Sequence, residues 1–164
     1  MSFNSNLLFW PLLALLFAIP TLLIPRHAYK KFFIFGFILG GLLDVLSILI
    51  IGNLLGEFSY RAGPLMAWGI PIFIPVSFTF VWMIFFYFLP VRTEFLIPYI
   101  AGFSGFAVLI GHVEQNLGFF KYHHGSIRGT ALTAIVFLLW FSLSAWVYRY
   151  YQPKLAATRN EQPR

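Results

Sequence analysis

The hydrophobic positions of the chain fall into long uninterrupted runs separated by short polar segments. A helix needs about 20 apolar residues to cross the roughly 30 Å hydrocarbon core of a bilayer. The runs that meet this length are about Leu7–Ile24, Phe32–Leu55, Ile70–Leu89, Phe95–Leu117 and Thr130–Tyr148. The pattern therefore predicts an all-α, polytopic membrane protein that folds as a five-transmembrane-helix bundle.

The composition excludes several classes of protein. Of the 164 residues, 60% are hydrophobic and 10% are charged, whereas a soluble domain carries about 25% charged residues. A soluble enzyme and a disordered chain are therefore excluded, and the absence of cysteine excludes disulfides and thiolate sites. The net charge of +6 comes from basic residues at the ends of the runs, where they meet lipid headgroups. We expect membrane lipids as partners, and no nucleic acid.

The basic residues predict the orientation of the bundle, because Lys and Arg concentrate on the cytoplasmic side of membrane proteins. With the N-terminus outside, the outer side holds Arg61, Lys121 and Arg128. The inner side then holds Arg26, Lys30, Lys31, Arg92, Arg149, Lys154, Arg159 and Arg164. We therefore expect a multi-pass protein of the bacterial cytoplasmic membrane, with its N-terminus outside. A five-helix domain, residues 1–151, would precede a basic, disordered cytoplasmic tail, residues 152–164.

Small and polar residues at helical spacing predict which helix faces pack together, since close backbone approach and hydrogen bonds drive helix association in lipid. The second run carries one such stripe: Gly36, Gly40, Asp44, Ser47 and Ile51. The fourth run carries two stripes on nearly opposite faces: Gly102, Gly105, Leu109, His112 and Asn116, and Ser104, Ala107, Gly111, Glu114 and Gly118. This pattern predicts the fourth run at the centre of the bundle, with the third and fifth runs facing lipid.

Asp44 and Glu114 are the only acidic residues inside the runs. An ionised carboxylate near the bilayer midplane costs at least about 2.5–3.5 kcal/mol. Asp44 is therefore either a neutral carboxyl bonded to a neighbouring helix or a group that handles protons or a ligand. His112 and Glu114 are two residues apart and face opposite ways, whereas His112 shares a face with Asn116. If the protein is an enzyme, its candidate catalytic residues are Asp44, Glu114 and His112.

The remaining polar side chains gather in the outer third of the predicted bundle. We expect an outward-facing, water-accessible pocket with Asp44 at its floor. Its expected residues are Asp44, Asn53, Glu57, Tyr60, Arg61, Trp68, His112, Glu114, Asn116, Tyr122, His123, His124 and Arg128. If the second helix continues past residue 57, Glu57 and Arg61 form an ion pair one turn apart.

The chain lacks the short motifs that mark common cofactor sites. It contains no Walker or Rossmann glycine pattern and no H-E-x-x-H, and no run contains the lysine that retinal requires. Haem would need paired histidines on facing helices, and only His112 lies within a run. His123 and His124, in a glycine-bounded loop, are candidates for a metal site or for a hydrogen-bonded turn. We predict no cofactor.

Three sparse motifs resemble a family of small five-span membrane proteins that is common in spore-forming Firmicutes and has no settled function. The motifs are Gly56-Glu57-Phe58-Ser59-Tyr60, Gly69-Ile70-Pro71-Ile72, and Glu114 with Gly118 and Tyr122-His123-His124-Gly125. This resemblance covers roughly residues 25–151 and implies a topology rather than an activity.

A fainter similarity is to the small membrane lycopene cyclases and carotenoid hydratases. It rests on Asp44, Gly56, Tyr60 and Pro71-Ile72. The acidic pair of those enzymes is absent, since Phe73 and Ile74 stand in its place. Because cyclisation protonates a polyene with such carboxylates, the departure argues against cyclase activity.

The sequence is therefore compatible with three functions. The first is a non-enzymatic membrane protein whose outer pocket binds a lipid or small amphiphile, or docks a partner membrane subunit. The second is an intramembrane enzyme acting on an isoprenoid or lipid, and the third is a small proton-coupled transporter. A homo-oligomer is also compatible with the sequence, because an inverted-repeat transporter of five spans would need two copies.

Overall fold

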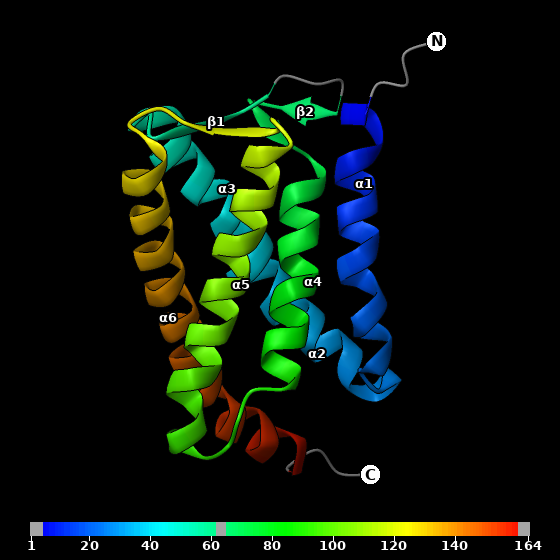
Figure 1. The fold of residues 1–164 in the computed structure, drawn as a ribbon. Helices are drawn as coiled ribbons and strands as arrows, with labels where there is room; N and C mark the ends of the chain where they lie inside the picture. The colour runs from blue at the N-terminus through cyan, green and yellow to red at the C-terminus, as the bar shows by residue number, and fades with distance from the viewer. Residues whose placement is uncertain (1–4, 62–64, 161–164) are drawn as a thin grey trace.

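A computed structural model describes residues 5–61 and 65–160 as an up-and-down bundle of helices with two short β-ladders at one end (Figure 1). The helical elements are α1 (Ser5–Ala18), η1 (Ile19–Leu23), α2 (Arg26–Gly36), η2 (Phe37–Leu42), α3 (Leu43–Ser47), η3 (Ile48–Leu54), α4 (Phe73–Tyr87), η4 (Thr93–Phe95), α5 (Leu96–Asn116) and α6 (Ser126–Asn160). The strands are β1 (Phe58–Tyr60), β2 (Met66–Ala67), β3 (Ile70–Pro71) and β4 (Phe120–Tyr122).

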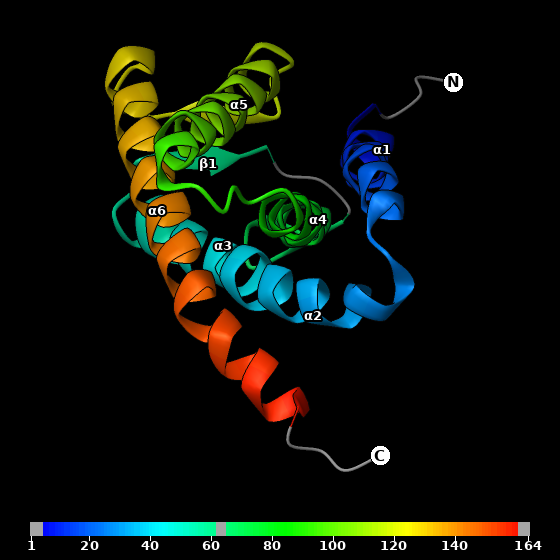
Figure 2. The same cartoon turned by 90° about the horizontal axis from the view of Figure 1, so that it is seen from below.

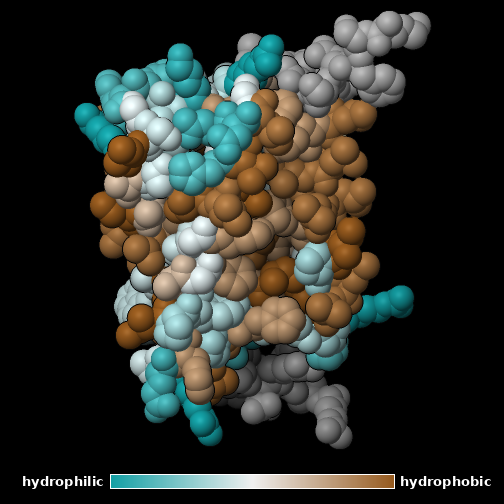
Figure 3. All heavy atoms as spheres, in the orientation of Figure 1, coloured by the Kyte–Doolittle hydropathy of each residue, from teal (hydrophilic) through white to brown (hydrophobic). Residues whose placement is uncertain are grey.

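Three helices are long and apolar enough to cross a membrane, namely Arg26–Leu54, Thr93–Asn116 and Ser126–Gln152. Two further apolar helices, Leu8–Leu23 and Phe73–Tyr87, are shorter. On the face shown in Figure 3, hydrophobic side chains form a broad band around the middle of the bundle, with hydrophilic side chains at both ends. These observations confirm a predominantly helical membrane protein.

The second long helix changes its winding twice along its length. Elements η2 and η3 are π-helical, and the α-helical turn between them, α3, carries Asp44. A π-helical segment adds a residue to a turn and so changes the direction in which the following side chains point. Gly56, with a positive φ of 65°, follows the end of this helix. The chain then enters β1 instead of continuing as a helix through Glu57 and Arg61.

Helix α4 lies at the centre of the bundle, so the prediction that the third run faces lipid is wrong. Seen from below, α1, the second long helix and α5 surround it (Figure 2). Glycines allow the close approach of the second helix: a Cβ on Gly36 would lie 2.6 Å from the Thr79 carbonyl oxygen, and one on Gly40 would lie 2.7 Å from that of Phe78. The apolar residues of α4 are therefore shielded by protein rather than by lipid.

The prediction that both polar stripes of α5 pack against protein is correct for only one of them. Ser104, Ala107 and Glu114 are buried against the bundle. No described atom lies within 4 Å of a Cβ built on Gly102 or Gly105, and both glycines are exposed. Helix α5 is therefore not the centre of the bundle, because the Gly102–Gly105 part of its second stripe is exposed.

Aromatic side chains fill the half of the bundle away from the β-ladders. Trp82 is fully buried, with its ring centroid 4.2 Å from that of Phe141, and its Nε1 donates to the Ser144 hydroxyl at 3.1 Å. Phe85 and Phe86 extend this cluster along α4. Helix α6 thus contributes one face to the core, while Leu139, Leu143 and Trp146 on its other face are exposed. The expectation that the fifth run faces lipid holds for that second face only.

The α4–α5 connection is tied to α6 at the end of the bundle opposite the ladders. Arg149 donates hydrogen bonds to the carbonyl oxygens of Pro90 at 2.6 Å and Val91 at 3.1 Å. Helix α6 continues to Asn160, so the expectation of a disordered tail from residue 152 is wrong for residues 152–160. Residues 161–164 of that tail lie outside the described residues.

Candidate functional site

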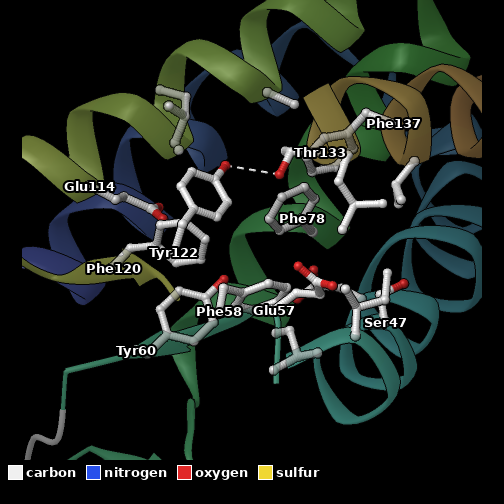
Figure 4. Close-up of a pocket in the computed structure, with 18 of the residues that line it drawn as sticks. Ser47, Glu57, Phe58, Tyr60, Phe78, Glu114, Phe120, Tyr122, Thr133 and Phe137 are labelled. Carbon is white, nitrogen blue, oxygen red and sulfur yellow. Dashed lines mark hydrogen bonds between the residues drawn. The ribbon is translucent and has the colours of Figure 1, made fainter. Parts of the chain in front are cut away.

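A cavity of about 80 Å³ lies between the second long helix, α4, α5 and α6, beneath the ladder formed by β1 and β4. We call this ladder the β1–β4 ribbon. The side chains around the cavity come from all of these elements (Figure 4). Both acidic residues of the spans, Asp44 and Glu114, belong to its lining. Its lining residues are Asp44, Ser47, Ile48, Ile51, Glu57, Phe58, Tyr60, Phe78, Ala107, Ile110, Gly111, Glu114, Phe120, Tyr122, Leu132, Thr133, Val136, Phe137 and Trp140.

The β1–β4 ribbon covers the cavity with aromatic side chains. The strands pair antiparallel, with Phe58 opposite Tyr122 and Tyr60 opposite Phe120. Because successive side chains of a strand point to opposite faces, these four rings share one face, and Lys121 projects from the other. The ring centroids of Phe58 and Phe120 are 5.1 Å apart, and those of Tyr60 and Phe120 are 5.3 Å apart. The ribbon therefore gives the cavity a roof that is aromatic inside and polar outside.

His123 holds the two strands in register. Its Nδ1 donates to the Gly56 carbonyl oxygen at 3.0 Å, which leaves Nε2 to accept from the Ser59 hydroxyl at 2.8 Å in the neutral imidazole. Its backbone nitrogen also donates to the Glu57 carbonyl oxygen at 3.0 Å. The structure thus favours the hydrogen-bonding role for His123, which joins β1 to the segment after β4. The exposed His124 does not line the cavity.

Two buried carboxyl groups line the cavity from the membrane-spanning helices. Asp44, on α3, is 5% exposed, and Glu114, on the last turn of α5, is 7% exposed. The turn that ends α5 depends on Gly118, whose φ of 75° favours glycine. Asp44 Oδ2 is buried and has no hydrogen-bond partner among the described residues. Such a group is costly to leave unsatisfied, so Asp44 marks the cavity as a place where a partner is missing.

Phenol and hydroxyl groups provide the other side-chain polar atoms of the site. The Tyr122 hydroxyl is hydrogen-bonded to Thr133 Oγ1 at 2.9 Å (Figure 4). The Tyr122 ring also lies directly against Gly129, where no side chain would fit. Burial raises the pKa of Tyr122. Burial, followed by the carboxyl groups of Glu114 and Asp44, raises the pKa of Tyr60 well above its ordinary value. Both phenols are therefore neutral and able to donate hydrogen bonds into the site.

A stack of three aromatic rings forms one wall of the cavity. The Phe78 ring lies parallel to those of Phe137, at an interplanar angle of 7°, and Trp140, at 6°. Trp140 is held in place because its Nε1 donates to the Leu39 carbonyl oxygen at 2.7 Å, which joins α6 to η2. The sequence did not predict these aromatic walls, because the third and fifth runs were expected to face lipid. The spacing of aromatic residues along a helix does not distinguish a lipid-facing ring from one that lines a cavity.

Glu57, the residue before β1, forms an ion pair with Arg128 in the first turn of α6. Arg128 donates from Nη2 to Glu57 Oε1 at 2.8 Å, whereas the sequence suggested a pair between Glu57 and Arg61. That expectation is wrong because the second helix ends at Leu54, so residues 57 and 61 are not one helical turn apart. Arg61 instead contributes its backbone nitrogen to the Phe119 carbonyl oxygen, at 2.9 Å.

Replacing Arg128 with alanine is expected to have a small effect on stability. The Arg128 side chain is 64% exposed, so solvent screens its pair with Glu57, and exposed pairs contribute about 0–1 kcal/mol. We expect a loss below about 1 kcal/mol in the free energy of unfolding, measured by titration with sodium dodecyl sulfate. Lys121→Ala, on the outer face of the ribbon, is the matched control. A loss above about 2 kcal/mol in Arg128→Ala alone would show that the pair holds the ribbon closed.

Five of the residues that the sequence predicted to share one pocket line the cavity, and the others do not. Those that line it are Asp44, Glu57, Tyr60, Glu114 and Tyr122. Those that do not are Asn53, Arg61, Trp68, His112, Asn116, His123, His124 and Arg128. His112 contacts Thr130 Oγ1 through Nε2 at 3.2 Å, away from the Glu114 carboxyl, as their spacing predicts. Asn53 donates to the Trp68 carbonyl oxygen at 3.2 Å in the β2–β3 region.

The described residues contain no group of three or more His, Cys, Asp or Glu side chains placed to hold a metal ion. His123 and His124 therefore do not form such a group with a neighbouring acid or histidine in the part of the chain that is described. No protein-family model, curated protein or solved structure matches the chain. What the protein does is accordingly inferred from the geometry of the cavity.

Proposed function

We propose that this is a five-span protein of the bacterial cytoplasmic membrane that binds the polar end of a lipid or small amphiphile in the cavity beneath the β1–β4 ribbon. The observation that carries the proposal is the composition of this cavity. Two carboxyls that are more than nine-tenths buried lie among phenols and aromatic rings at membrane depth, and one of their oxygens lacks a hydrogen-bond partner among the described residues. Polar groups buried in this way within a membrane mark functional sites.

The distribution of charge supports an N-out, C-in orientation. The end of the bundle opposite the ribbon carries Arg26, Lys30, Lys31, Arg92 and Arg149, and the ribbon end carries Arg61, Lys121 and Arg128. By the positive-inside rule, the first end faces the cytoplasm and the ribbon faces outward. The two shorter apolar helices complete the five spans, since α4 is sheltered by its neighbours and does not have to match the bilayer thickness alone.

The size of the cavity limits what enters it. A volume of about 80 Å³ accommodates several water molecules or a small polar group, whereas drug-sized ligands occupy pockets of about 300–1,000 Å³. A whole lipid does not fit. We therefore place only the polar end of the ligand in the cavity, with its apolar chain lying along the hydrophobic surface of the helices.

Filling the cavity is expected to release the ligand. A Cβ on Gly111 would lie 3.9 Å from the nearest described atom, the Tyr122 hydroxyl oxygen, so Gly111→Leu fills the cavity without a backbone clash. Native mass spectrometry of the chain purified in mild detergent should show a bound amphiphile on the wild type and at least about ten-fold less on Gly111→Leu.

Gly105→Leu is the matched control, because it makes the same substitution on the exposed face of the same helix. We expect this variant to retain the ligand at the wild-type level. A wild-type chain that carries no lipid or amphiphile after gentle purification would contradict the proposal. Equal retention by Gly111→Leu and Gly105→Leu would move the binding site away from the cavity.

An intramembrane enzyme acting on a lipid or isoprenoid is the second candidate. Its support is that Asp44 and Glu114 line the same cavity, so both carboxyls could reach one substrate as an acid–base pair. Profiling the membrane lipids of cells that express Asp44→Asn or Glu114→Gln tests this, since unchanged lipids against a deletion that alters them would exclude it. A proton-coupled transporter has less support, because Trp82, Phe85 and Phe86 pack the core away from the ribbon. The cavity between α1, α4 and α5 at that end has no acidic or histidine side chain in its described lining.

A further inference from the structure

The ionisable groups of the cavity that can carry charge near neutral pH are all acidic. Asp44, Glu57 and Glu114 line it, and its described lining contains no lysine, arginine or histidine. Arg128, which does not line the cavity, engages Oε1 of Glu57. A ligand that enters this cavity therefore meets carboxyl groups from three separate segments of the chain and no cationic side chain among the described lining residues.

Two of the carboxyl oxygens have no hydrogen-bond partner among the described residues. They are Asp44 Oδ2 and Glu57 Oε2, and both are buried. Asp44 is only 5% exposed, so bulk water does not replace the missing donor. A buried acceptor without a donor costs about 1–3 kcal/mol, and more when it is charged. The missing group is therefore one that brings hydrogen-bond donors, and positive charge would further favour it.

The arrangement of the carboxyls does not favour a metal ion. Ca²⁺ and Mg²⁺ take several oxygen ligands at about 2.0–2.6 Å, and no three His, Cys, Asp or Glu side chains among the described residues are placed to hold a metal ion. An anionic headgroup is disfavoured because it would meet no lysine, arginine or histidine in the described lining. An organic cation meets both conditions, because it is larger than a metal ion and can reach separated oxygens through several N–H groups.

The aromatic walls suit the same ligand. Phe78, Phe137 and Trp140 form a parallel stack on one side, and Tyr60 and Phe120 lie on the ribbon. Aromatic faces attract ammonium groups electrostatically, most strongly where water is excluded. Rings and carboxyls together thus favour a cation with an apolar stem over a neutral alcohol, which would supply one donor and no charge.

We propose that the cavity binds the protonated amine of an amphiphile, an alkylammonium group whose N–H bonds reach the Asp44 and Glu57 carboxyls while its first methylenes contact the aromatic wall. This inference rests on the proposed function and specifies the class of its ligand. A quaternary ammonium lacks the N–H donors that the unpartnered oxygens require. The headgroup of an aminophospholipid carries a phosphate near its amine, and the described lining of the cavity offers that phosphate no cationic side chain.

The test compares octyl probes that share one apolar chain. Octylamine, octyltrimethylammonium, octanol and octanoate are titrated at pH 7.5 into the purified full chain in maltoside micelles, with binding followed by isothermal calorimetry. Dihexanoylphosphatidylethanolamine serves as the aminophospholipid. We expect octylamine to bind about ten-fold or more tightly than each of the others, since hydrogen bonds to charged groups contribute about 1.5–3 kcal/mol and 1.4 kcal/mol is ten-fold in affinity.

Matched variants separate binding from partition into the micelle. Asp44→Asn is expected to lose the preference for octylamine by about ten-fold, and Glu57→Gln serves as a second variant if circular dichroism shows that Asp44→Asn does not fold. Ser104→Ala is the control, because the Ser104 hydroxyl is also buried and unpartnered among the described residues but does not line the cavity. We expect it to bind octylamine as the wild type does.

Each other result overturns a defined part of the proposal. Equal affinity for octanol and octylamine would leave amphiphile binding in place and exclude an amine as its ligand. Equal affinity for octyltrimethylammonium or for the aminophospholipid would overturn the requirement for N–H donors or the exclusion of phosphate. No binding of any octyl probe, together with no co-purified amphiphile, would overturn the proposed function itself.

Discussion

Replacing Trp82 with alanine is expected to lower the free energy of unfolding by about 3–5 kcal/mol, the usual cost of removing a large buried aromatic side chain. Trp82 is fully buried on the central helix α4 and packs against Trp140 and Phe141 of α6, with ring centroids 4.7 Å and 4.2 Å away. The substitution also leaves the buried Ser144 hydroxyl without its donor. Titration with sodium dodecyl sulfate, followed by circular dichroism, measures the loss.

Two further variants show whether this loss comes from the position of Trp82 in the core. Trp146→Ala removes the same side chain from the exposed face of α6, where Trp146 is 64% exposed, and we expect a change within about 0.5 kcal/mol. Trp82→Phe keeps an aromatic ring and loses only part of the packing and the bond to Ser144, so its effect should lie between the two. Equal losses for Trp82→Ala and Trp146→Ala would contradict the central position of α4.

Gly40→Leu is expected to destabilise the bundle by about 3 kcal/mol, at the upper end of what overpacking usually costs. A Cβ at this position would lie 2.7 Å from the Phe78 carbonyl oxygen and 3.0 Å from Trp82 Cβ. The backbone of α4 cannot move aside without disturbing its packing on α1 and α6, so the second helix must shift. The melting temperature of the purified chain, measured in one detergent for all variants, reports the effect.

Gly105→Leu is the matched control for Gly40→Leu. No described atom lies within 4 Å of a Cβ on Gly105, and leucine is a better helix former than glycine by nearly 1 kcal/mol. We therefore expect this variant to melt at the wild-type temperature or slightly above it. If Gly40→Leu melts no lower than Gly105→Leu, the close approach of the second helix to α4 is wrong.

These predictions concern a molecule whose two halves differ in character. The half away from the β-ladders is packed around Trp82 and its aromatic neighbours. The other half contains the cavity, whose lining includes Asp44 and whose roof is the β1–β4 ribbon. If the ribbon faces outward, as we propose, a site at this end is suited to capturing a molecule from the outer side of the membrane.

Much of the fold follows from the sequence, because the length and polarity of a segment decide whether it can cross a bilayer. The second, fourth and fifth apolar runs are helices of the required length. The first is a shorter helix, and the third is shorter than its run because Ile70 and Pro71 belong to β3. The sequence also singles out Asp44 and Glu114, since acidic residues are rare inside apolar runs.

The tertiary structure alone decided how these helices are ordered and what they enclose. Ser59 and His123 are 64 residues apart, and only the fold shows that they join two strands over the cavity. Hydropathy did not indicate that α4 is central, because lipid and a protein core are equally apolar and an aromatic side chain suits both. The lateral order of the helices depends instead on close contacts such as that of Gly40 with Phe78, which are visible only when both helices are in place.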